Sequence, residues 1–369
     1  MNLGRALPAG FFADTELPEG EYLRLHLNEN PYGPPPGAIE AVHAETGAFL
    51  HRYPGSECTE LRAVLAAHFG VAPEMIAVGN GTDELVLLAS LTFLREPGAC
   101  VLTTAGTFPG YVLSAASVGA AAHTLPLHDA AVPVEALADE LNRGSAALAF
   151  VCNPVNPTGT VLDRAGVHRL VDAAERGRAI LVLDEAYLDY AGPAHEFALA
   201  ALAEGRRLVV LRTFSKAWGL AAVRLGVAIG PADLVARVAA TAQALPFNVN
   251  RAAQRAVLRA LEHPEHMARV RSENARTRHL LHGYLDKLGF RCIPSVTNFV
   301  MARIPDEWQA DAAGLVKRLA MDHRILVRDL APLGSPGYVR ISVGTSAEVE
   351  RLTKALADLL GKPLPHGGI

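Results

Sequence analysis

The chain has 369 residues, of which 50% are hydrophobic and 20% are charged, and its net charge is −4. Its length exceeds that of a typical single domain, so we expect one large and one smaller domain that share an interface. The slightly negative charge and the absence of Lys/Arg runs argue against nucleic acid as the main partner.

Cysteine spacing and apolar runs indicate the environment of the chain. The four cysteines lie far apart, without the paired spacing of a zinc or redox site, so we expect no disulfide framework and no metal. The densest apolar run, residues 85–94, is far shorter than the roughly 18 residues that span a membrane. These features predict a reduced, cytoplasmic protein.

The first 36 residues are expected to form an irregular arm, because prolines and glycines interrupt any helix. The arm contains the motif Leu27-Asn-Glu-Asn-Pro-Tyr-Gly-Pro34. A helix is expected at residues 37–50. The turn that follows, Arg52-Tyr53-Pro54-Gly55, presents a tyrosine that indicates little by itself.

Residues 60–230 alternate between short apolar runs and segments long enough for helices. Seven runs predict strands, at residues 75–78, 99–102, 121–125, 147–152, 179–183, 208–211 and 225–229. Strands separated in this way form a largely parallel sheet covered by helices on both faces, so the expected fold class is α/β. In such sheets ligands bind beyond the carboxyl ends of the strands.

After Pro231 the pattern changes to a second, smaller α/β unit. The stretch begins with long helices, the clearest at residues 250–261 and 265–288. Strands expected at 299–304, 325–328 and 338–343 then alternate with helices at 310–321 and 347–360. We expect this unit to pack with the arm. The predicted division is an arm (1–36), a large domain (37–270) and a small C-terminal domain (271–369).

Lys216 is the most unusual charged residue. It follows the apolar run at 208–211, and it is the only lysine among the first 286 residues, where arginine supplies the other cations. A buried lysine, unlike arginine, loses its proton and attacks carbonyl groups. Lys216 is therefore either a Schiff-base lysine or a loop lysine that extends its amine to solvent.

Two loops after predicted strands could face an anion or a ligand. In Gly79-Asn-Gly-Thr-Asp-Glu84, the amides of Gly81, Thr82 and Asp83 could bind an anion at a helix N-terminus, or the string could be an ordinary helix cap. In Asn153-Pro-Val-Asn156-Pro, two prolines could project Asn156 into the crevice, or simply form a tight turn.

Asp184 and Arg224 offer opposite charges at neighbouring strand ends. A carboxylate at the end of a buried strand is costly unless a cation pairs with it, so Asp184 needs either a local arginine or a cationic ligand, such as a protonated pyridine nitrogen. Arg224 could hold a phosphate with two hydrogen bonds, or lie at the surface.

Taken together, these groups match one cofactor. Pyridoxal 5'-phosphate presents an aldehyde, a phosphate, a ring nitrogen and a ring hydroxyl, and an amine, an anion site, a carboxylate and phenol or amide groups would each bind one of them. Their joint occurrence at strand ends makes this cofactor the best match.

The chain resembles the fold-type I pyridoxal-phosphate aminotransferases of classes I and II, and within them the histidinol-phosphate aminotransferase group. The resemblance covers nearly the whole chain, in order: Asn28-Glu-Asn-Pro-Tyr-Gly-Pro34, Arg52-Tyr53-Pro54, Gly79 to Glu84, Asn156-Pro-Thr-Gly159, Asp184-Glu-Ala-Tyr187, Thr213-Phe-Ser-Lys216, Arg224 and Tyr338-Val-Arg340-Ile-Ser-Val-Gly-Thr345. It implies a homodimeric enzyme that uses an amino donor and a 2-oxo acid.

The resemblance also implies roles for individual residues. Lys216 would carry the cofactor and then move a proton at the substrate carbon, and Asp184 would keep the pyridine nitrogen protonated. Tyr187 and Asn156 would bind the ring hydroxyl. The expected phosphate ligands are Gly81, Thr82, Asp83, Thr213, Ser215, Arg224 and, from the other subunit, Tyr53. Arg340 would bind the substrate α-carboxylate, and Arg328 would be a further substrate-site residue.

The sequence departs from the family pattern at two places. Phe108 stands where a tyrosine usually stacks on the ring, so it stacks without a hydroxyl. Residues 7–12, Leu-Pro-Ala-Gly-Phe-Phe, replace a motif whose tyrosine is associated with the substrate phosphate. We therefore expect weaker use of histidinol phosphate than of a carboxylate-bearing, for example aromatic, donor.

Three other functions use the same cofactor. A lyase, such as a phosphothreonine decarboxylase-like protein, or a carbon–carbon bond-forming enzyme would share all of these residues. A cofactor-binding regulatory module normally carries a DNA-binding segment, which neither the residues before Gly20 nor those after Leu360 would supply.

Overall fold

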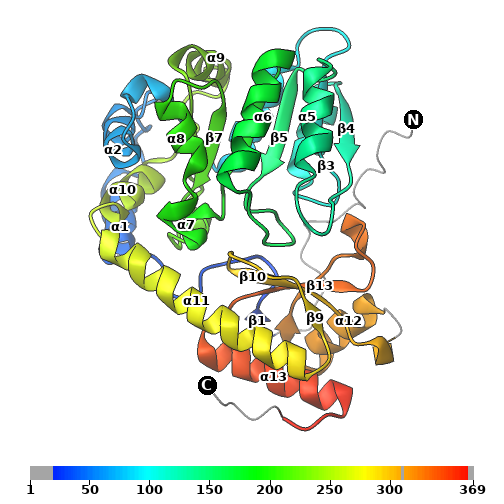
Figure 1. The fold of residues 1–369 in the computed structure, drawn as a ribbon. Helices are drawn as coiled ribbons and strands as arrows, with labels where there is room; N and C mark the ends of the chain where they lie inside the picture. Colours follow the sequence, from blue (N-terminus) through cyan, green and yellow to red (C-terminus); the bar gives the residue numbers. More distant parts are fainter. Residues whose placement is uncertain (1–19, 309–310, 365–369) are drawn as a thin grey trace.

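The computed structural model describes residues 20–308 and 311–364. A large α/β unit and a smaller one lie against each other, with the long helix α11 (Pro264–Lys287) along one side (Figure 1). Residues 7–12, on which one substrate expectation rests, lie outside the described residues. Within the described residues, no helix is long and apolar enough to cross a membrane.

The large unit is built on a seven-stranded sheet, as the sequence predicted. Its strands are β2 (Ile76–Gly79), β3 (Cys100–Thr104), β4 (Ala121–Leu125), β5 (Leu148–Cys152), β6 (Ile180–Asp184), β7 (Val209–Thr213) and β8 (Gly226–Ile229), in the order β2-β8-β7-β6-β5-β3-β4. β8 is antiparallel to both neighbours, and the other adjacent pairs are parallel. The start of β8 therefore lies at the edge where the parallel strands end.

Helices cover both faces of this sheet because successive strand residues point to opposite sides and both sides are apolar. One face packs against helices that include α5 (Val134–Asn142), α6 (Arg164–Gly177) and α8 (Phe197–Ala203). The other packs against α3 (Thr82–Phe93), α4 (Gly110–Ser117) and α9 (Ala232–Ala242). Further helices of this unit are α1 (Ala38–Phe49), α2 (Thr59–Phe69), α7 (Leu188–Ala191) and α10 (Arg251–Ala260).

The small unit has a four-stranded antiparallel sheet. Its order is β12 (Arg328–Asp329), β13 (Tyr338–Ser342), β10 (Phe299–Arg303) and β9 (Arg291–Cys292), packed with α12 (Ala312–His323) and α13 (Ser346–Leu360). The strand predicted at 325–328 is instead two strands, because β11 (Ile325–Leu326) pairs with the arm and β12 with β13. Short 3₁₀ helices lie at Pro73–Met75, Pro193–His195, Ala221–Val223, Asp306–Trp308 and Ala331–Leu333.

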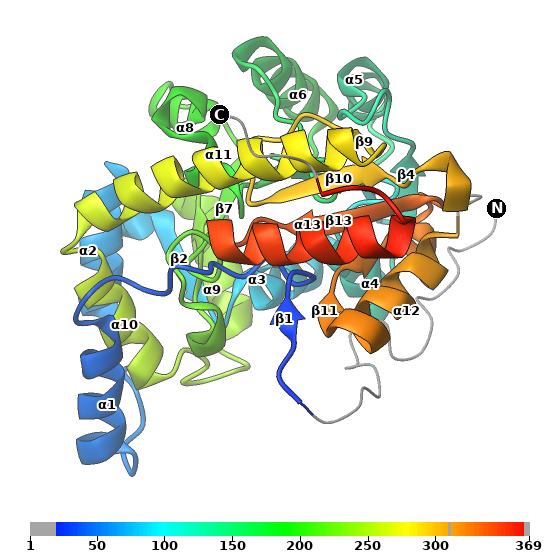
Figure 2. The same cartoon turned by 90° about the horizontal axis from the view of Figure 1, so that it is seen from below.

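The arm adds a strand to the small unit. β1 (Leu23–Arg24) runs parallel to β11 and lies beside it in Figure 2. Leu23 and Leu25 are buried in the core of the small unit, and the Ser342 amide donates to the Leu25 carbonyl at 2.8 Å. These contacts bring the arm residues that follow Leu25 to the space between the two units.

Candidate active site

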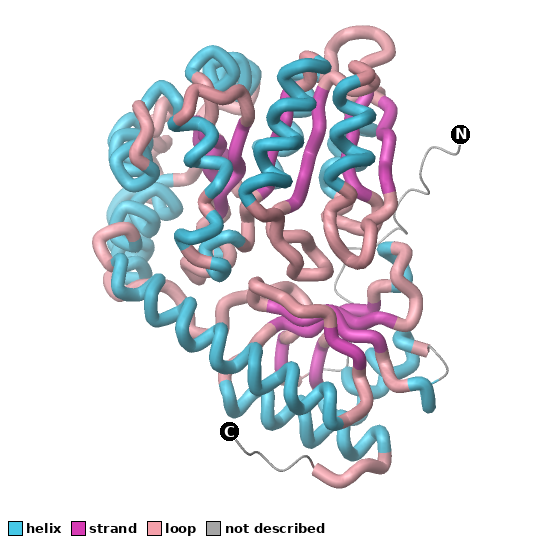
Figure 3. Tube along the Cα trace, in the orientation of Figure 1, coloured by secondary structure: helices cyan, strands magenta, loops and turns pink. Residues whose placement is uncertain are grey.

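Strand ends of the large sheet gather the predicted residues at one edge. Gly226, at the start of β8, is paired with Gly79 at the end of β2 and with Thr213 at the end of β7. β5 and β6 are parallel to β7, so their carboxyl ends lie at the same edge. Loops of the large unit face the small sheet in Figure 3. The geometry thus places the candidate site between the two units.

Arg224 forms a cup at the N-terminus of α3 together with Gly81, Asp83, Thr213 and Ser215. Its Nη2 donates to Asp83 Oδ2 at 2.8 Å and its Nη1 donates to Ser215 Oγ at 3.1 Å. The Ser215 amide donates to Thr213 Oγ1 at 3.1 Å. Backbone amides at a helix start, a hydroxyl and a guanidinium are the groups that bind a phosphate.

Gly81 is required by the shape of this cup. Its φ of 82° and ψ of 167° belong to a region that is essentially open only to glycine. A Cβ at Gly81 would also collide with Nη2 of Arg224. The local sequence therefore leaves the space next to the guanidinium open, and Thr82 follows as the first residue of α3.

The amine of Lys216 lies between the arm and Tyr187. Its Nζ donates to the Leu27 carbonyl at 2.9 Å and lies 5.7 Å from the centre of the Tyr187 ring. Burial, and then the nearby Arg340 guanidinium, lower the pKa of Lys216 to about 8. A lysine with this pKa has an appreciable neutral fraction close to neutral pH, as a nucleophilic amine needs.

Asp184 is buried, with 5% of its surface exposed, at the end of β6. Tyr111 Oη donates to its Oδ2 at 2.6 Å, and the Ala186 amide donates to its Oδ1 at 3.1 Å. Burial raises the pKa of Asp184 to about 6. Among the described residues no arginine or lysine forms an ion pair with it, so a local arginine is not its partner and a cationic ligand remains.

The neighbouring carboxylate has the partner that Asp184 lacks. Glu185 Oε2 accepts a hydrogen bond from Arg212 Nε at 2.8 Å, and both side chains are almost fully buried. Arg212 lies on β7, so this ion pair joins the ends of the two strands that present Asp184 and Lys216.

Tyr187 and Asn156 are bound to the arm and to the small unit. Tyr187 Oη accepts a hydrogen bond from Asn28 Nδ2 at 3.0 Å. Asn156 Oδ1 accepts one from Arg340 Nη1 at 2.6 Å. Both expected ligands of a ring hydroxyl therefore lie where the two units and the arm meet.

Arg340 and Arg328 lie opposite each other on β13 and β12, so their side chains leave the same face of the sheet. Arg340 is only 8% exposed, its Nη2 donates to the His26 carbonyl at 2.7 Å, and burial lowers its pKa to about 10. Its Nε has no hydrogen-bond partner within the described chain. An unpaired buried donor of this kind favours an anionic ligand.

The two remaining predicted residues differ in their surroundings. Phe108 is partly buried and meets Tyr111 edge-on, with ring centres 5.3 Å apart. Tyr53 is 79% exposed, and its ring stacks on Phe247 at 4.7 Å. Of the described residues of its own chain, none forms a hydrogen bond with the Tyr53 hydroxyl.

The sequence did not predict the residues whose hydrogen bonds hold the site residues in place. Asn28 contacts Tyr187 and, through its Oδ1, accepts a hydrogen bond from Ser342 Oγ at 3.1 Å. The amide of Asn298 donates to the Asn28 carbonyl at 3.0 Å. Asn28 lies in the arm motif and Tyr111 three residues after Phe108, but their partners are far away in the sequence, so no local signal identified them.

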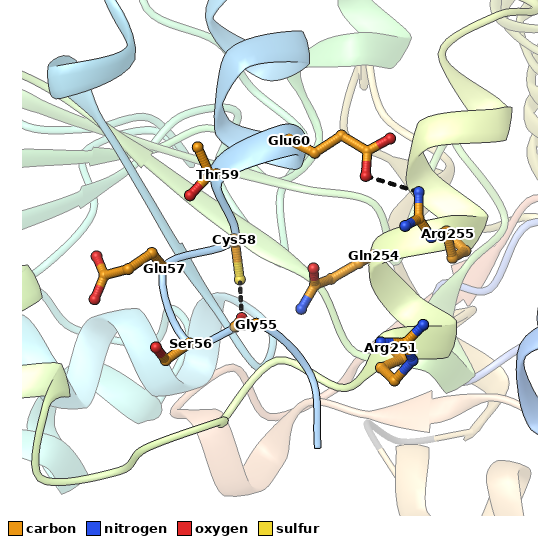
Figure 4. A pocket seen from close by; sticks show the side chains of 9 residues that line it. All are labelled: Gly55, Ser56, Glu57, Cys58, Thr59, Glu60, Arg251, Gln254 and Arg255. Atoms are coloured by element: carbon orange, nitrogen blue, oxygen red, sulfur yellow. Dashed lines mark hydrogen bonds and ion pairs between the residues drawn. The ribbon is translucent and has the colours of Figure 1, made fainter. Parts of the chain in front are cut away.

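A surface hollow of about 380 Å³ lies elsewhere, between the start of α2 and α10 (Figure 4). It contains none of the predicted site residues; it is lined by Gly55, Ser56, Glu57, Cys58, Thr59, Glu60, Arg251, Gln254 and Arg255. Its two arginines are paired, Arg251 with Glu45 and Arg255 with Glu60, each at 2.8 Å. The chemistry of Lys216 and Asp184 therefore identifies the active site better than this hollow does.

Residues 20–356 match the family of class I and II aminotransferases, so the chain belongs to that family. This membership confirms the resemblance found in the sequence, the expected α/β fold and the expected pyridoxal-phosphate-dependent aminotransferase. It favours amino transfer over the lyase and the regulatory module.

Among particular relatives, the chain is similar to histidinol-phosphate aminotransferases. It is 37% identical to that of an Anaeromyxobacter species over 340 residues, which is 92% of this chain and 91% of the relative. The enzyme of Moorella thermoacetica is 32% identical over 351 residues, 94% of this chain and 87% of the relative. The crystal structure of histidinol-phosphate aminotransferase from Sinorhizobium meliloti, in complex with pyridoxal-5'-phosphate, has a TM-score of 0.83 at 30% identity, covering 92% of this chain and 91% of that one.

Proposed function

We propose that the chain uses one site beside Lys216 for both halves of an amino transfer, first from a donor amine and then to a 2-oxo acid. The observation that supports this most directly is an amine of lowered pKa, Lys216, set among an anion cup, a buried carboxylate and two arginines. Bound pyridoxal phosphate supplies an aldehyde for the donor amine and a ring that accepts electrons when a proton leaves the donor carbon.

Each proposed role follows from the position of the residue. The Lys216 amine holds the cofactor and then moves the proton at the donor carbon. Asp184, without another cation, holds the positive charge at the ring nitrogen. The phosphate ligands are Gly81, Thr82, Asp83, Thr213, Ser215 and Arg224. Tyr187 and Asn156 bind the ring hydroxyl, and Phe108 covers the ring.

Arg340 serves both half-reactions in this proposal. A 2-oxo acid brings a carboxylate whatever the donor is, and a planar guanidinium matches a carboxylate or a phosphate with two hydrogen bonds. Arg328, opposite Arg340, adds positive charge on the same face of the sheet. The donor is therefore an amine that carries an anionic group.

Two donors fit that description. Histidinol phosphate is favoured by the similarity of the chain to histidinol-phosphate aminotransferases over more than nine tenths of its length. An aromatic amino acid is favoured by Phe108, which provides ring surface without a hydroxyl, and by the sequence of residues 7–12. The expectation that histidinol phosphate is the weaker donor stays a prediction.

Competition between the two donors tests this prediction. We would measure kcat/KM for histidinol phosphate and for phenylalanine with the same 2-oxo acid, in the wild type and in Arg340→Ala. We expect the aromatic donor to have the higher kcat/KM and to lose about 100-fold or more in the variant, because it loses its carboxylate partner. A large preference of the wild type for histidinol phosphate would reject the aromatic donor and favour the first candidate.

We also propose that the chain works as a cytoplasmic homodimer in which Tyr53 reaches the phosphate of the other subunit. Tyr53 is exposed in its own chain, as are the apolar side chains of Leu50, Ile39 and Phe247. Exposed apolar side chains of this kind favour an interface with a second copy. The free cysteines at positions 58, 100, 152 and 292 support the reducing compartment.

A further inference from the structure

Tyr111 and Asp184 form a short polar contact at the candidate site. Tyr111 lies on α4 with none of its surface exposed, and its Oη lies 2.6 Å from Asp184 Oδ2. Short O–H···O⁻ bonds of this length are typical of a hydroxyl that donates to an ionised carboxylate, and they are stronger than bonds between neutral groups.

The ring of Tyr111 is held on two sides. It stacks on Phe150 of β5, with ring centres 4.9 Å apart and planes 7° from parallel. Phe108 packs against it edge-on, at 78° between the planes. A buried ring fixed in this way has little freedom to turn its hydroxyl away from Asp184.

In the hydrogen bond between Tyr111 and Asp184, the proton stays on the Tyr111 hydroxyl, also when the other ionisable groups around Asp184 are considered. Two charged groups act on the Asp184 carboxylate: Lys216, which follows β7, and Asp83 on α3. Two further groups would interact with it if they lost their protons: Cys152 at the end of β5 and Tyr187 after β6. Burial raises the pKa of Cys152 and of Tyr187 to about 12, and raises the pKa of Tyr111 well above its usual value. Tyr111 is therefore the donor and Asp184 the acceptor.

We propose that Tyr111 is a positioning residue that keeps Asp184 ionised and aimed at the protonated ring nitrogen of the cofactor. This inference rests on the proposed role of Asp184. The Ala186 amide binds Oδ1 of Asp184 and the Tyr111 hydroxyl binds Oδ2, so the two donors fix the plane of the carboxylate.

Loss of the Tyr111 hydroxyl has a defined electrostatic consequence. It would leave Oδ2 of Asp184 without its donor in an apolar pocket, which disfavours the carboxylate and raises the pKa of Asp184 above about 6. A protonated Asp184 cannot pair with a cationic ring nitrogen. Cofactor binding in the Tyr111→Phe variant should therefore weaken at a higher pH than in the wild type.

The first experiment measures the Kd of pyridoxal phosphate for the full chain, stripped of cofactor, between about pH 5 and 8. We expect the wild-type Kd to rise as the pH falls through about 6, and the midpoint for Tyr111→Phe to lie about one unit higher. Binding by the variant should be about twofold to fivefold weaker between the two midpoints and about tenfold weaker below both. An unchanged midpoint in Tyr111→Phe would overturn the proposal.

Tyr190→Phe is a matched control for this change. Tyr190 is also buried, at 4% exposure, and its hydroxyl has no hydrogen-bond partner among the described residues. The same atom is removed, but Asp184 keeps its donor. We expect the wild-type midpoint in this control, and an equal shift in both variants would overturn a specific role for Tyr111.

A second replacement changes the hydrogen bond with little change of shape. 3-Fluorotyrosine at position 111 is a more acidic donor than tyrosine, so it should strengthen the bond to Asp184 and move the midpoint to lower pH. This opposite shift is measurable even if Tyr111→Phe does not fold. A midpoint that stays in place or moves up would overturn the proposal.

The ¹⁵N chemical shift of the ring nitrogen of bound, labelled cofactor separates the inference from the role on which it rests. If both hold, Asp184→Asn changes this shift at neutral pH, and Tyr111→Phe changes it at a pH below its raised midpoint. A change in Asp184→Asn alone would overturn the role of Tyr111 only. No change in Asp184→Asn would overturn the role of Asp184, and with it the inference.

Discussion

At the scale of single residues, the lowered pKa of Lys216 combines the effect of burial with the effects of neighbouring charges. Burial is the larger cause of its lowered pKa, and the Arg340 guanidinium is the next. Because the neutral amine is the reactive form, the rate at which the cofactor-free chain forms its covalent link to pyridoxal phosphate should increase as the pH rises through about 8.

Arg340→Met tests this charge effect. Removing the positive charge makes protonation of Lys216 easier, so the midpoint of the rate profile should move up by as much as about one pH unit, or about 1.4 kcal/mol. Stopped-flow absorbance would follow formation of the covalent link. Arg318→Met, which removes an exposed arginine on α12, is the control and should keep the wild-type midpoint. A midpoint in Arg340→Met that does not rise would contradict the effect.

At the scale of elements, the cup depends on β8 running against its neighbours. That direction places Arg224 next to the start of α3, where Gly81 leaves room for its guanidinium. The Gly81→Ala variant should lose about 1–3 kcal/mol of stability through backbone strain. It should also bind pyridoxal phosphate at least tenfold more weakly, because the guanidinium must move away from Asp83 and Ser215.

Gly192→Ala is the matched control for Gly81→Ala. Gly192 has a similar φ of 90° and ψ of 172°, but a Cβ there would approach no atom closer than 3.4 Å. Both variants should be strained, and only Gly81→Ala should lose affinity in equilibrium dialysis. Pyridoxal, which has no phosphate, should discriminate little between Gly81→Ala and the wild type. Equal affinity of Gly81→Ala and the wild type for pyridoxal phosphate would argue against the cup.

These elements also show how much of the fold and of the candidate site the sequence alone could predict. Buried strands such as β5 and β6 carry continuous apolar runs, so the seven strands and the polar residues at their ends could be predicted. Local patterns contain no information on partners far away in the sequence. Tyr111 is 73 residues from Asp184, and Asn28 is 159 residues from Tyr187, so only folding joins them. The run at 325–328 looked continuous in the sequence, but the structure divides it because its two halves pair with different strands.

At the scale of the whole molecule, the candidate site depends on contacts between units. Arg340 of the small unit binds Asn156 of the large unit, and its second hydrogen bond is to the arm at His26. Separate apolar cores lie on either side of this contact, and α11 runs from one core to the other. We propose that the boundary between the large and small domains lies near residue 270, within α11, so that this helix links them.

The proposed dimer can be tested by mixing subunits that are defective in different places. Lys216→Ala removes the reactive amine, and Tyr53→Phe removes the hydroxyl expected to act across the interface. In a hybrid dimer, the subunit that keeps Lys216 receives Tyr53 from its partner, so one of the two sites is complete. Random exchange of equal amounts makes about half of the dimers hybrid, so about a quarter of all sites should regain wild-type activity. Each variant alone and a mixture kept below the exchange temperature serve as controls. If native mass spectrometry shows hybrid dimers and activity does not recover, Tyr53 acts within its own chain or has no role in the reaction.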